Sequence, residues 1–237
     1  MPFRKLPKKI DPCPIIDAII ELQLESSVPS EAFFGLLYNR FGKDFPQLTK
    51  LPILQLPDVI RESDPSLLSK PHHKLSNDRL ALQIGPRVLS ISSHPKYVGW
   101  SDFSRTVYKI LDDVNNLKVI KRFTRLGIRY LNFFEMNIFD QVTLQITMDN
   151  SPLKNSETTI RTIFESGDLK SKLNIGNDIT VIVDKQKKRG SIIDIDVITD
   201  KGLENIKDTI EKCHLEEKRI FFSLLKEDYE RTLNPSY

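Results

Sequence analysis

The chain has 237 residues, of which 39% are hydrophobic and 28% are charged, as in an ordinary globular protein of one large domain or two small, closely packed ones. The formal net charge of +3 is too small to indicate nucleic-acid binding by itself. No run of 18 apolar residues predicts a membrane span, and no apolar segment follows the basic residues of the start MPFRKLPKKIDP, so we expect neither a membrane anchor nor a signal peptide and predict a cytoplasmic protein.

The first elements are a strand and a helix. Apolar and polar residues alternate through PIIDAIIELQLES, residues 14–26, which predicts a half-buried strand. Pro29 is expected to open a helix that Gly42 ends, because Phe33 and Phe41 recur on one apolar face. The next stretch, from Pro46 to Pro71, is punctuated by prolines and predicts irregular or edge-strand structure.

Two short strands and a second helix complete the first half. RLALQI and RVLSIS read as strands on either side of the turn at Gly85 and Pro86. Ser101 is a candidate N-cap for a helix whose stripe includes Phe103, Val107 and Leu111.

The second half begins with a long alternating strand, VIKRFTRLGIRYLNFFE, residues 119–135. Further strands are expected at QVTLQITM, TTIRTIFES, LKSKLNI, ITVIVD and SIIDIDVIT, with a hairpin turn through KQKKRG before the last one. A long helix is predicted from Thr199 or Asp200, with Cys213 on its inner stripe, and a break near His214 or Phe222 is an alternative.

This order predicts an α+β fold of two pseudo-repeated halves of antiparallel sheet, covered on one face by helices and closed by the long C-terminal helix. The predicted fold would be saddle-like or helix-grip-like. We expect one compact unit with a basic N-terminal arm (1–14), a first half (15–118) and a second half (119–237). The repeat is imperfect, since only MNIFDQ follows the second opening strand where the first half has a helix.

The two opening strands carry polar faces of opposite sign. Acidic residues recur at even spacing in the first strand: Asp17, Glu21 and Glu25. Basic residues do so in the second: Lys121, Arg125 and Arg129. If these strands pair, the rows form an ion-pair ladder. Alternatively, Arg125 and Arg129 stay available to bind phosphate or an acidic partner, because a guanidinium group binds such anions in a bidentate way.

A second basic cluster lies in the KQKKRG turn and consists of Lys185, Lys187, Lys188 and Arg189. A solvated hairpin tip is the simpler interpretation, and contact with a phosphate backbone is the alternative. The chain's single tryptophan, Trp100, and nearby Tyr97 are expected to dock the start of the helix against the preceding strand, with ligand stacking as the alternative.

Catalytic and metal-binding motifs are absent from the sequence: we find no HExxH, paired Cys/His, EF-hand, GxSxG, P-loop or GxGxxG pattern. The nearest metal-like group is Asp194 and Asp196 in DID, with Asp184 across the expected hairpin, and an outward polar strand face is the simpler interpretation. Cys13 and Cys213 are expected to be free thiols, although a disulfide between them is an alternative. We therefore predict no cofactor and no metal, and we favour a non-enzymatic role while leaving enzymatic activity open.

Several segments in order, PIIDAIIEL, LQIGPRVLSIS, YVGWSDF and RLGIRYLNFF, resemble a sporadically distributed prokaryotic family of uncharacterised proteins. A C-terminal helix with His214, Phe221 and Leu224 matches the same family pattern. The resemblance covers nearly the whole chain and carries no catalytic residues. The patchy distribution of the family suggests an accessory component of a mobile or defence-type gene cassette, such as a toxin–antitoxin system.

Three functions follow as hypotheses. The first is a non-enzymatic interaction protein that binds a protein partner, encoded by an adjacent gene, or forms a homodimer. The second is a nucleic-acid-binding saddle that uses Arg125, Arg129 and the 185–189 cluster. The third is a metal-dependent nuclease or hydrolase that uses Asp184, Asp194 and Asp196.

Overall fold

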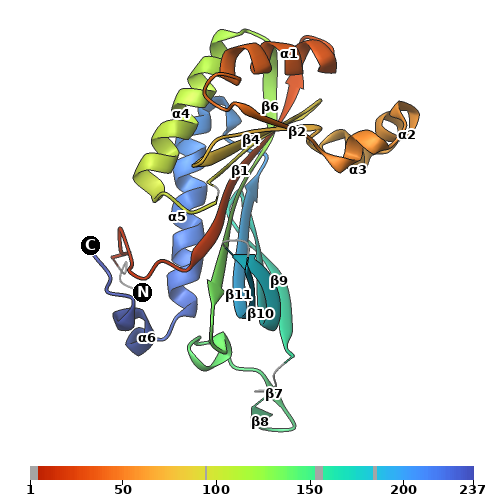
Figure 1. Ribbon diagram of the computed structural model, residues 1–237. Helices are drawn as coiled ribbons and strands as arrows, with labels where there is room; N and C mark the ends of the chain where they lie inside the picture. The colour runs from red at the N-terminus through yellow and green to blue at the C-terminus, as the bar shows by residue number, and fades with distance from the viewer. Residues whose placement is uncertain (1–4, 94, 153–156, 184–185) are drawn as a thin grey trace. The chain divides into compact units, whose positions relative to one another are not determined.

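The computed structural model describes all residues except 1–4, 94, 153–156 and 184–185 (Figure 1). Its main feature is a nine-stranded sheet in the order β2-β3-β4-β5-β1-β6-β11-β10-β9. The first strands of the two halves, β1 and β6, are neighbours in this order. On its other side, β1 pairs with β5, the last strand of the first half, and β6 pairs with β11, the last strand of the second half. This mirrored order confirms the predicted α+β class and the pseudo-repeat.

The chain divides into two compact units. Unit 1 contains residues 1–16, 129–197 and 211–237, and unit 2 contains residues 17–128 and 198–210. The strands β1 (Ile15–Ser26), β6 (Ile120–Phe134) and β11 (Gln186–Thr199) and the helix α5 (Ile206–Leu224) contribute residues to both.

Unit 2 contains most of the first half. Its other strands are β2 (Gln47–Lys50), β3 (His73–Ser76), β4 (Leu80–Gly85) and β5 (Val88–Ser93). Its helices are α1 (Ser30–Phe41), η1 (Pro52–Gln55), α2 (Asp58–Ser63), α3 (Pro65–Leu68), α4 (Trp100–Asn116) and η3 (Leu203–Asn205). The predicted strands at 79–84 and 87–92 and both predicted helices are confirmed to within one or two residues.

One face of the unit 2 strands forms its core. In the register of β1, β5, β4 and β3, the residues Leu22, Leu89, Ile84 and His73 lie side by side, and the first three are at most 1% exposed. The other face of the same strands is polar, as at Glu21, Ser90 and Gln83. The alternation predicted a half-buried strand at residues 14–26, and the burial pattern of β1 confirms it.

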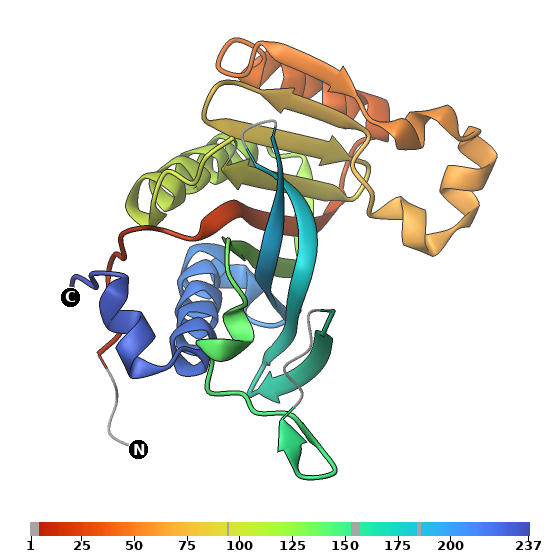
Figure 2. The same cartoon turned by 60° about the horizontal axis from the view of Figure 1, so that its bottom comes forward.

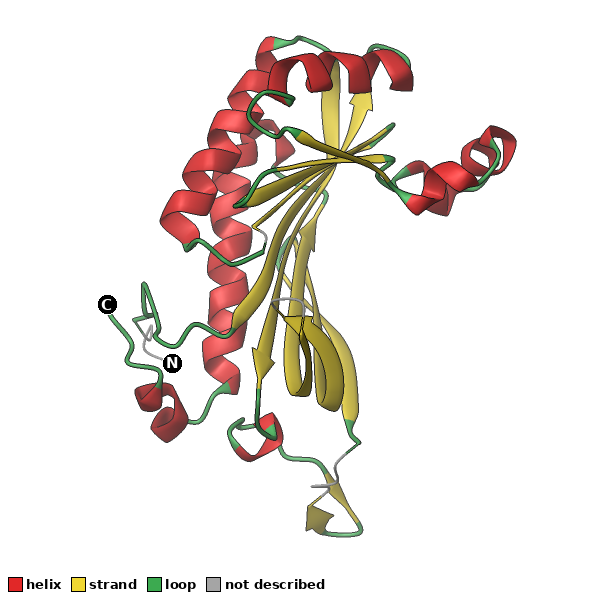
Figure 3. Ribbon diagram, viewed as in Figure 1, coloured by secondary structure: helices red, strands yellow, loops and turns green. Residues whose placement is uncertain are grey.

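Helices α1 and α4 add their apolar stripes to this core, and α4 runs alongside the strands (Figure 3). Phe33, Leu37, Phe103 and Val107 are fully buried. The helix α4 begins two residues earlier than predicted. Gly99 occupies its N-cap position instead of Ser101, with a φ of 87° that favours glycine.

The proline-punctuated stretch contains more helix than we predicted. Between β2 and β3 the chain forms η1, α2 and α3, which we call the α2–α3 arm, residues 51–71. Figures 1 and 2 show this arm at one end of the unit 2 strands. Each of the three short helices has proline at its first position or directly before it, which suits the fixed φ of that residue.

Unit 1 contains β9 (Thr159–Ser166), β10 (Leu169–Val183), most of α5, α6 (Glu227–Thr232), η2 (Ile138–Asp140) and a two-stranded hairpin, β7 (Thr147–Met148) and β8 (Ser151–Pro152). Its core combines Tyr130, Ile175, Ile193 and Ile195 from the strands with Cys213 from α5, each at most 1% exposed. The strand predicted at QVTLQITM is wrong except for β7, because residues 141–146 form turns and loop.

Three further sequence predictions differ from the structure of unit 1. LKSKLNI and the described part of the second predicted strand, residues 179–183, form the single strand β10, which continues through Asp178 with a φ of 64°. The residues after Lys185 in KQKKRG belong to β11 and not to a turn. The helix α5 starts at Ile206, later than predicted, and runs unbroken past His214.

Both chain ends lie in unit 1, where backbone hydrogen bonds join the N-terminal arm to the C-terminus, as between Lys8 and Ser236 at 2.6 Å. Cys13 and Cys213 are free thiols, as predicted. Burial raises the pKa of Cys213 to about 12. Within the described residues, no helix has the length and apolar character needed to cross a membrane.

Candidate functional site

The acidic and basic rows of the opening strands meet in part. In unit 2, Arg125 of β6 donates to Glu21 of β1 at 3.2 Å, which is one rung of the expected ladder. Arg122, which the sequence did not assign to the row, donates to Glu25 at 2.5 Å. Lys121 is exposed and contributes to the lowered pKa of Glu25, after the larger effect of Arg122.

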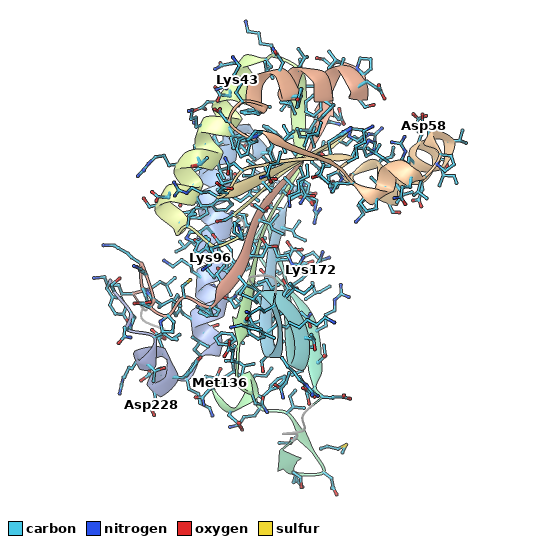
Figure 4. The ribbon with its side chains drawn as sticks, in the orientation of Figure 1. Lys43, Asp58, Lys96, Met136, Lys172 and Asp228 are labelled. Atoms are coloured by element: carbon cyan, nitrogen blue, oxygen red, sulfur yellow. The ribbon has the colours of Figure 1, made fainter. Side chains whose placement is uncertain are left out.

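The next arginine along β6 has a partner that the sequence did not predict. Arg129 makes a bidentate contact with Asp194 of β11, with nitrogen–oxygen distances of 2.7 and 2.8 Å. Asp196 lies 3.5 Å from the Nζ atom of Lys172, which Figure 4 labels on β10. Asp184 lies outside the described residues. The described residues contain no cluster of three His, Cys, Asp or Glu side chains placed to hold a metal ion.

The basic cluster of the expected hairpin tip lies on β11 instead. Lys188 binds Glu135, and Arg189 makes a bidentate contact with Asp178. Lys187 is exposed, and Lys185 lies outside the described residues. Arg189 lowers the pKa of Asp178, which has a positive φ in the neighbouring strand β10, and the pair joins β11 to β10.

Tyr97 and Trp100 lie at the entry to α4. Both rings contact Phe103 edge-on at a centroid separation of 6.4 Å, and Phe103 is fully buried. The Ser93 hydroxyl at the end of β5 donates to the carbonyl of Lys96 and accepts from the amide of Val98. These contacts are those expected of a docking role for the aromatic pair.

Replacing Arg129 by alanine is expected to lower the free energy of unfolding by about 1 kcal/mol, because it leaves the largely buried Asp194 carboxylate without a bidentate partner. Arg122→Ala is the matched control, since its pair is more exposed and should contribute less than about 0.5 kcal/mol. Urea unfolding measures both. Equal stability of Arg129→Ala and the wild type would show that the pair contributes nothing, and would favour the anion-binding alternative for this residue.

A pocket in unit 2 brings together chemistry that the sequence did not reveal. It has a volume of about 200 Å³ and lies between the start of α1, the α2–α3 arm and the β3–β4 strands. Its walls include Glu31, Phe34, Arg61, His72 and His73. A cavity of this size is smaller than typical drug-sized sites and suits a single side chain or a small group.

One wall is aromatic. The rings of Phe34 and His73 stack with their centroids 3.8 Å apart and an angle of 15° between their planes. Tyr38, one turn further along α1 and 46% exposed, contacts Phe34 at 5.9 Å. The rings of Tyr38, Phe34 and His73 therefore form a continuous row of contacts from the surface of α1 to the pocket wall. Burial lowers the pKa of His73, and Lys50 and Arg61 lower it further, which keeps the stacked ring neutral.

Arg61 organises the polar wall. Its Nε atom donates to the carbonyl of Leu56 at 3.1 Å, and its guanidinium group also binds Asp58, which Figure 4 labels on α2. Its Nη1 atom lies 3.3 Å from Nδ1 of His72. Because burial and then Arg61 lower the pKa of His72, that ring is neutral and accepts the hydrogen bond. Arg61 thus joins the α2–α3 arm to β3.

The rim carries one carboxylate. The Ser30 hydroxyl donates to Glu31 at 2.8 Å and lowers the pKa of that carboxyl group, and the nearby His72 and Arg61 make smaller contributions in the same direction. The pocket therefore combines a cation, two imidazole rings, an aromatic face and one carboxylate. This set suits a polar or acidic group with an apolar stem.

Exposed large hydrophobic side chains are concentrated in the part of the sequence that also supplies the pocket residues. Among the described residues, twelve large hydrophobic side chains are exposed, and six of them lie within residues 36–60. We call these six the 36–60 surface: Leu36, Tyr38, Leu48, Leu56, Val59 and Ile60. Val59 is the most exposed of all twelve, at 78%. The two α1 residues follow Phe34, and the three arm residues precede Arg61, so both groups adjoin pocket residues in sequence.

Sequence reasoning missed the pocket. It assigned no role to His72 and His73, and it predicted irregular or edge-strand structure for residues 46–71. The available signal was the isoleucine–valine pair Val59 and Ile60 between charged residues in a stretch without a periodic apolar face. Such residues have no obvious place in the core.

Comparisons with known proteins add no assignment: no family model matches the chain, and no curated protein matches it.

Proposed function

We propose that the protein is a non-enzymatic binding protein that holds a partner polypeptide on the 36–60 surface. The observation that carries this proposal is that six of the twelve exposed large hydrophobic side chains among the described residues fall within 25 residues of sequence, a stretch that also supplies residues of the pocket. Apolar groups gathered on a surface gain free energy when a partner removes them from water, whereas single scattered ones are common on any protein.

The pocket specifies the chemistry of the partner. Burial is the largest cause of the lowered pKa values of the pocket histidines; Arg61 lowers both further and Lys50 lowers that of His73, so two cations lie near these rings. We expect the partner to present an apolar segment with one acidic side chain, whose stem lies against the Phe34–His73 stack and whose carboxylate displaces the exposed Asp58 carboxylate from Arg61. A central polar anchor surrounded by apolar contacts is a common arrangement in protein interfaces.

The test is photo-crosslinking in cells that make the protein at its natural level. A photoreactive amino acid replaces Val59, which is 78% exposed, and the matched control replaces Ile182, which is 72% exposed on β10 in unit 1. We expect a specific adduct with one partner from position 59 and none from position 182. Mass spectrometry of the adduct identifies the partner and the segment that lies against the arm.

Point variants then test the surface itself. Val59→Ser with Ile60→Ser is expected to reduce partner binding at least about tenfold, because each removes exposed apolar area that the complex would bury. Met148→Ser, on an exposed residue of unit 1, is the control. Adducts of equal yield from positions 59 and 182, the absence of any adduct, or unchanged binding by the double variant would contradict the proposal.

The two other functions remain predictions from the sequence. For a nucleic-acid interface, carboxylates already neutralise the guanidinium groups of Arg125, Arg129 and Arg189. For metal-dependent hydrolysis, Asp194 and Asp196 each have a cationic partner. The adjacent-gene partner and the defence-type context are further expectations, which identification of the crosslinked partner would test.

A further inference from the structure

The strand β9 ends the nine-strand order in unit 1. It has eight residues, Thr159–Ser166, without glycine or proline, and it pairs with β10 in an uninterrupted register. The strand at the other end of the order, β2, has four residues and ends in Lys50. Short length and a terminal lysine are features that discourage edge pairing, whereas β9 is long and regular.

The two faces of β9 differ. Arg161, Ile163 and Glu165 share the face of Lys172, which lies opposite Ile163 in the register. On the other face, Ile160 and Phe164 lie opposite Ile175 and Ser171 of β10, both of which are fully buried. The second face therefore continues the core of unit 1, and Phe164 stays partly exposed at its margin.

We propose that β9 pairs in antiparallel fashion with β9 of a second copy of this chain, around a two-fold axis at Ile163. A two-fold axis perpendicular to the sheet keeps the same face outward in both copies, so that opposed residues share a face. With the axis at Ile163, each Arg161 lies opposite Glu165 of the other copy. An axis at Thr162 would place Arg161 opposite Ile163, and an axis at Phe164 would place it opposite Gly167.

The register with the axis at Ile163 places complementary side chains opposite each other on both faces of the paired β9 strands. On the outer face it forms two opposite-charge pairs on either side of the two Ile163 side chains, which are 49% exposed in one chain. Glu165 is available for this, since its contact with Lys170 is 3.9 Å long and its side chain is 72% exposed. On the inner face, Phe164 lies opposite Thr162 of the other copy, and the two Phe164 rings are diagonal neighbours that extend both cores.

Charge exchange tests this dimer by its molecular mass in sedimentation or light scattering. Arg161→Glu and Glu165→Arg should each weaken self-association at least about tenfold, because each places like charges in both pairs. An equimolar mixture of the two single variants should form heterodimers, since every pair is then complementary. The double variant Arg161→Glu/Glu165→Arg should restore the homodimer. The two single variants and the double variant alter only exposed side chains.

A crosslink tests the axis. In a Cys13→Ser background, Ile163→Cys should form an intermolecular disulfide, because directly opposed residues of antiparallel strands have Cα atoms about 4.5–5.5 Å apart. Ile182→Cys, which is also exposed, is the control and should stay reduced. A monomeric wild type, self-association that survives Arg161→Glu, a mixture that does not form heterodimers, or equal crosslinking of both cysteines would overturn the proposal. None of these results bears on the 36–60 surface, which lies in unit 2.

Discussion

Gly190→Ala is expected to destabilise the protein by about 3 kcal/mol, the upper end for an overpacked site. A Cβ atom at position 190 would lie 2.1 Å from the carbonyl oxygen of Phe134 and 2.9 Å from two ring atoms of Phe133. The backbone oxygen of a sheet strand cannot rotate away as a flexible side chain could. The steric overlap of the alanine Cβ atom with the Phe134 carbonyl can therefore be removed only if the β6 and β11 backbones separate.

Gly35→Ala is the matched control for this experiment. Gly35 lies in the exposed part of α1, and a Cβ atom there meets nothing within 4 Å. Alanine should therefore stabilise the protein by about 0.5–1 kcal/mol through its better helix propensity. Chemical unfolding of the two variants measures both changes. A loss below about 0.5 kcal/mol for Gly190→Ala would show that the strands are less closely packed at this point.

The second large effect is a pH dependence of stability that arises in α5. Burial raises the pKa of the Glu217 carboxyl group well above 4.5, and burial lowers the pKa of His214 from 6.5 to about 3. Both side chains are at most 8% exposed, and a hydrogen bond of 3.0 Å joins the His214 Nδ1 atom to the hydroxyl of Tyr130. The folded state therefore holds both groups in their neutral forms.

The signs of the two contributions are opposite. Above pH 4.5 the unfolded chain releases the Glu217 proton that the folded protein keeps, so this contribution to stability falls as the pH rises towards the raised pKa. Below pH 6.5 the unfolded chain binds a proton at His214 that the folded protein excludes, so stability falls as the pH decreases to about 3. Each slope is about 1.4 kcal/mol per pH unit, and the two oppose each other above pH 4.5, for as long as the pH is below both the raised pKa of Glu217 and the ordinary value of 6.5 for His214.

Glu217→Gln isolates the alkaline side of this profile. The variant should lose the decrease in stability that begins at pH 4.5 and ends at the raised pKa of Glu217, and above that range it should be more stable than the wild type, because the glutamine has no proton to release. Glu211→Gln, at an exposed position of the same helix, should leave the profile unchanged. Urea unfolding from pH 4 to 9 provides the measurement. Parallel profiles for Glu217→Gln and the wild type would show that Glu217 is ionised in the folded protein.

Much of the candidate site depends on residues whose local pattern is uninformative. His72 and His73 belong to a four-residue strand and the loop before it, and neither has a motif around it. Their chemistry comes from Phe34 and Arg61, which approach from two different helices. The opposite case is Cys213, whose place on the apolar stripe of α5 predicted its burial correctly.

The errors of sequence interpretation have a common physical origin. The KKRG residues were predicted as a turn because charge and glycine favour turns, but Gly190 is a strand residue required by the close approach of the Phe134 carbonyl. Likewise, the sequence predicted two strands separated at residues 176–178, yet β10 continues through Asp178, whose carboxylate Arg189 of the next strand holds. In both cases a contact with another strand overrides the local preference.

The sequence by itself determined the α+β class, the faces of β1 and β6 and the stripes of α1 and α4, because burial on one face imposes a period of about two or 3.6 residues that is visible locally. Only the tertiary structure decided that Arg129 meets Asp194, that four separate elements surround one pocket, and that β9 lies at the end of the sheet. These features depend on the order in which strands pair and on the path of the α2–α3 arm. Strand order is set by the free energy of the whole core, which no local periodicity records.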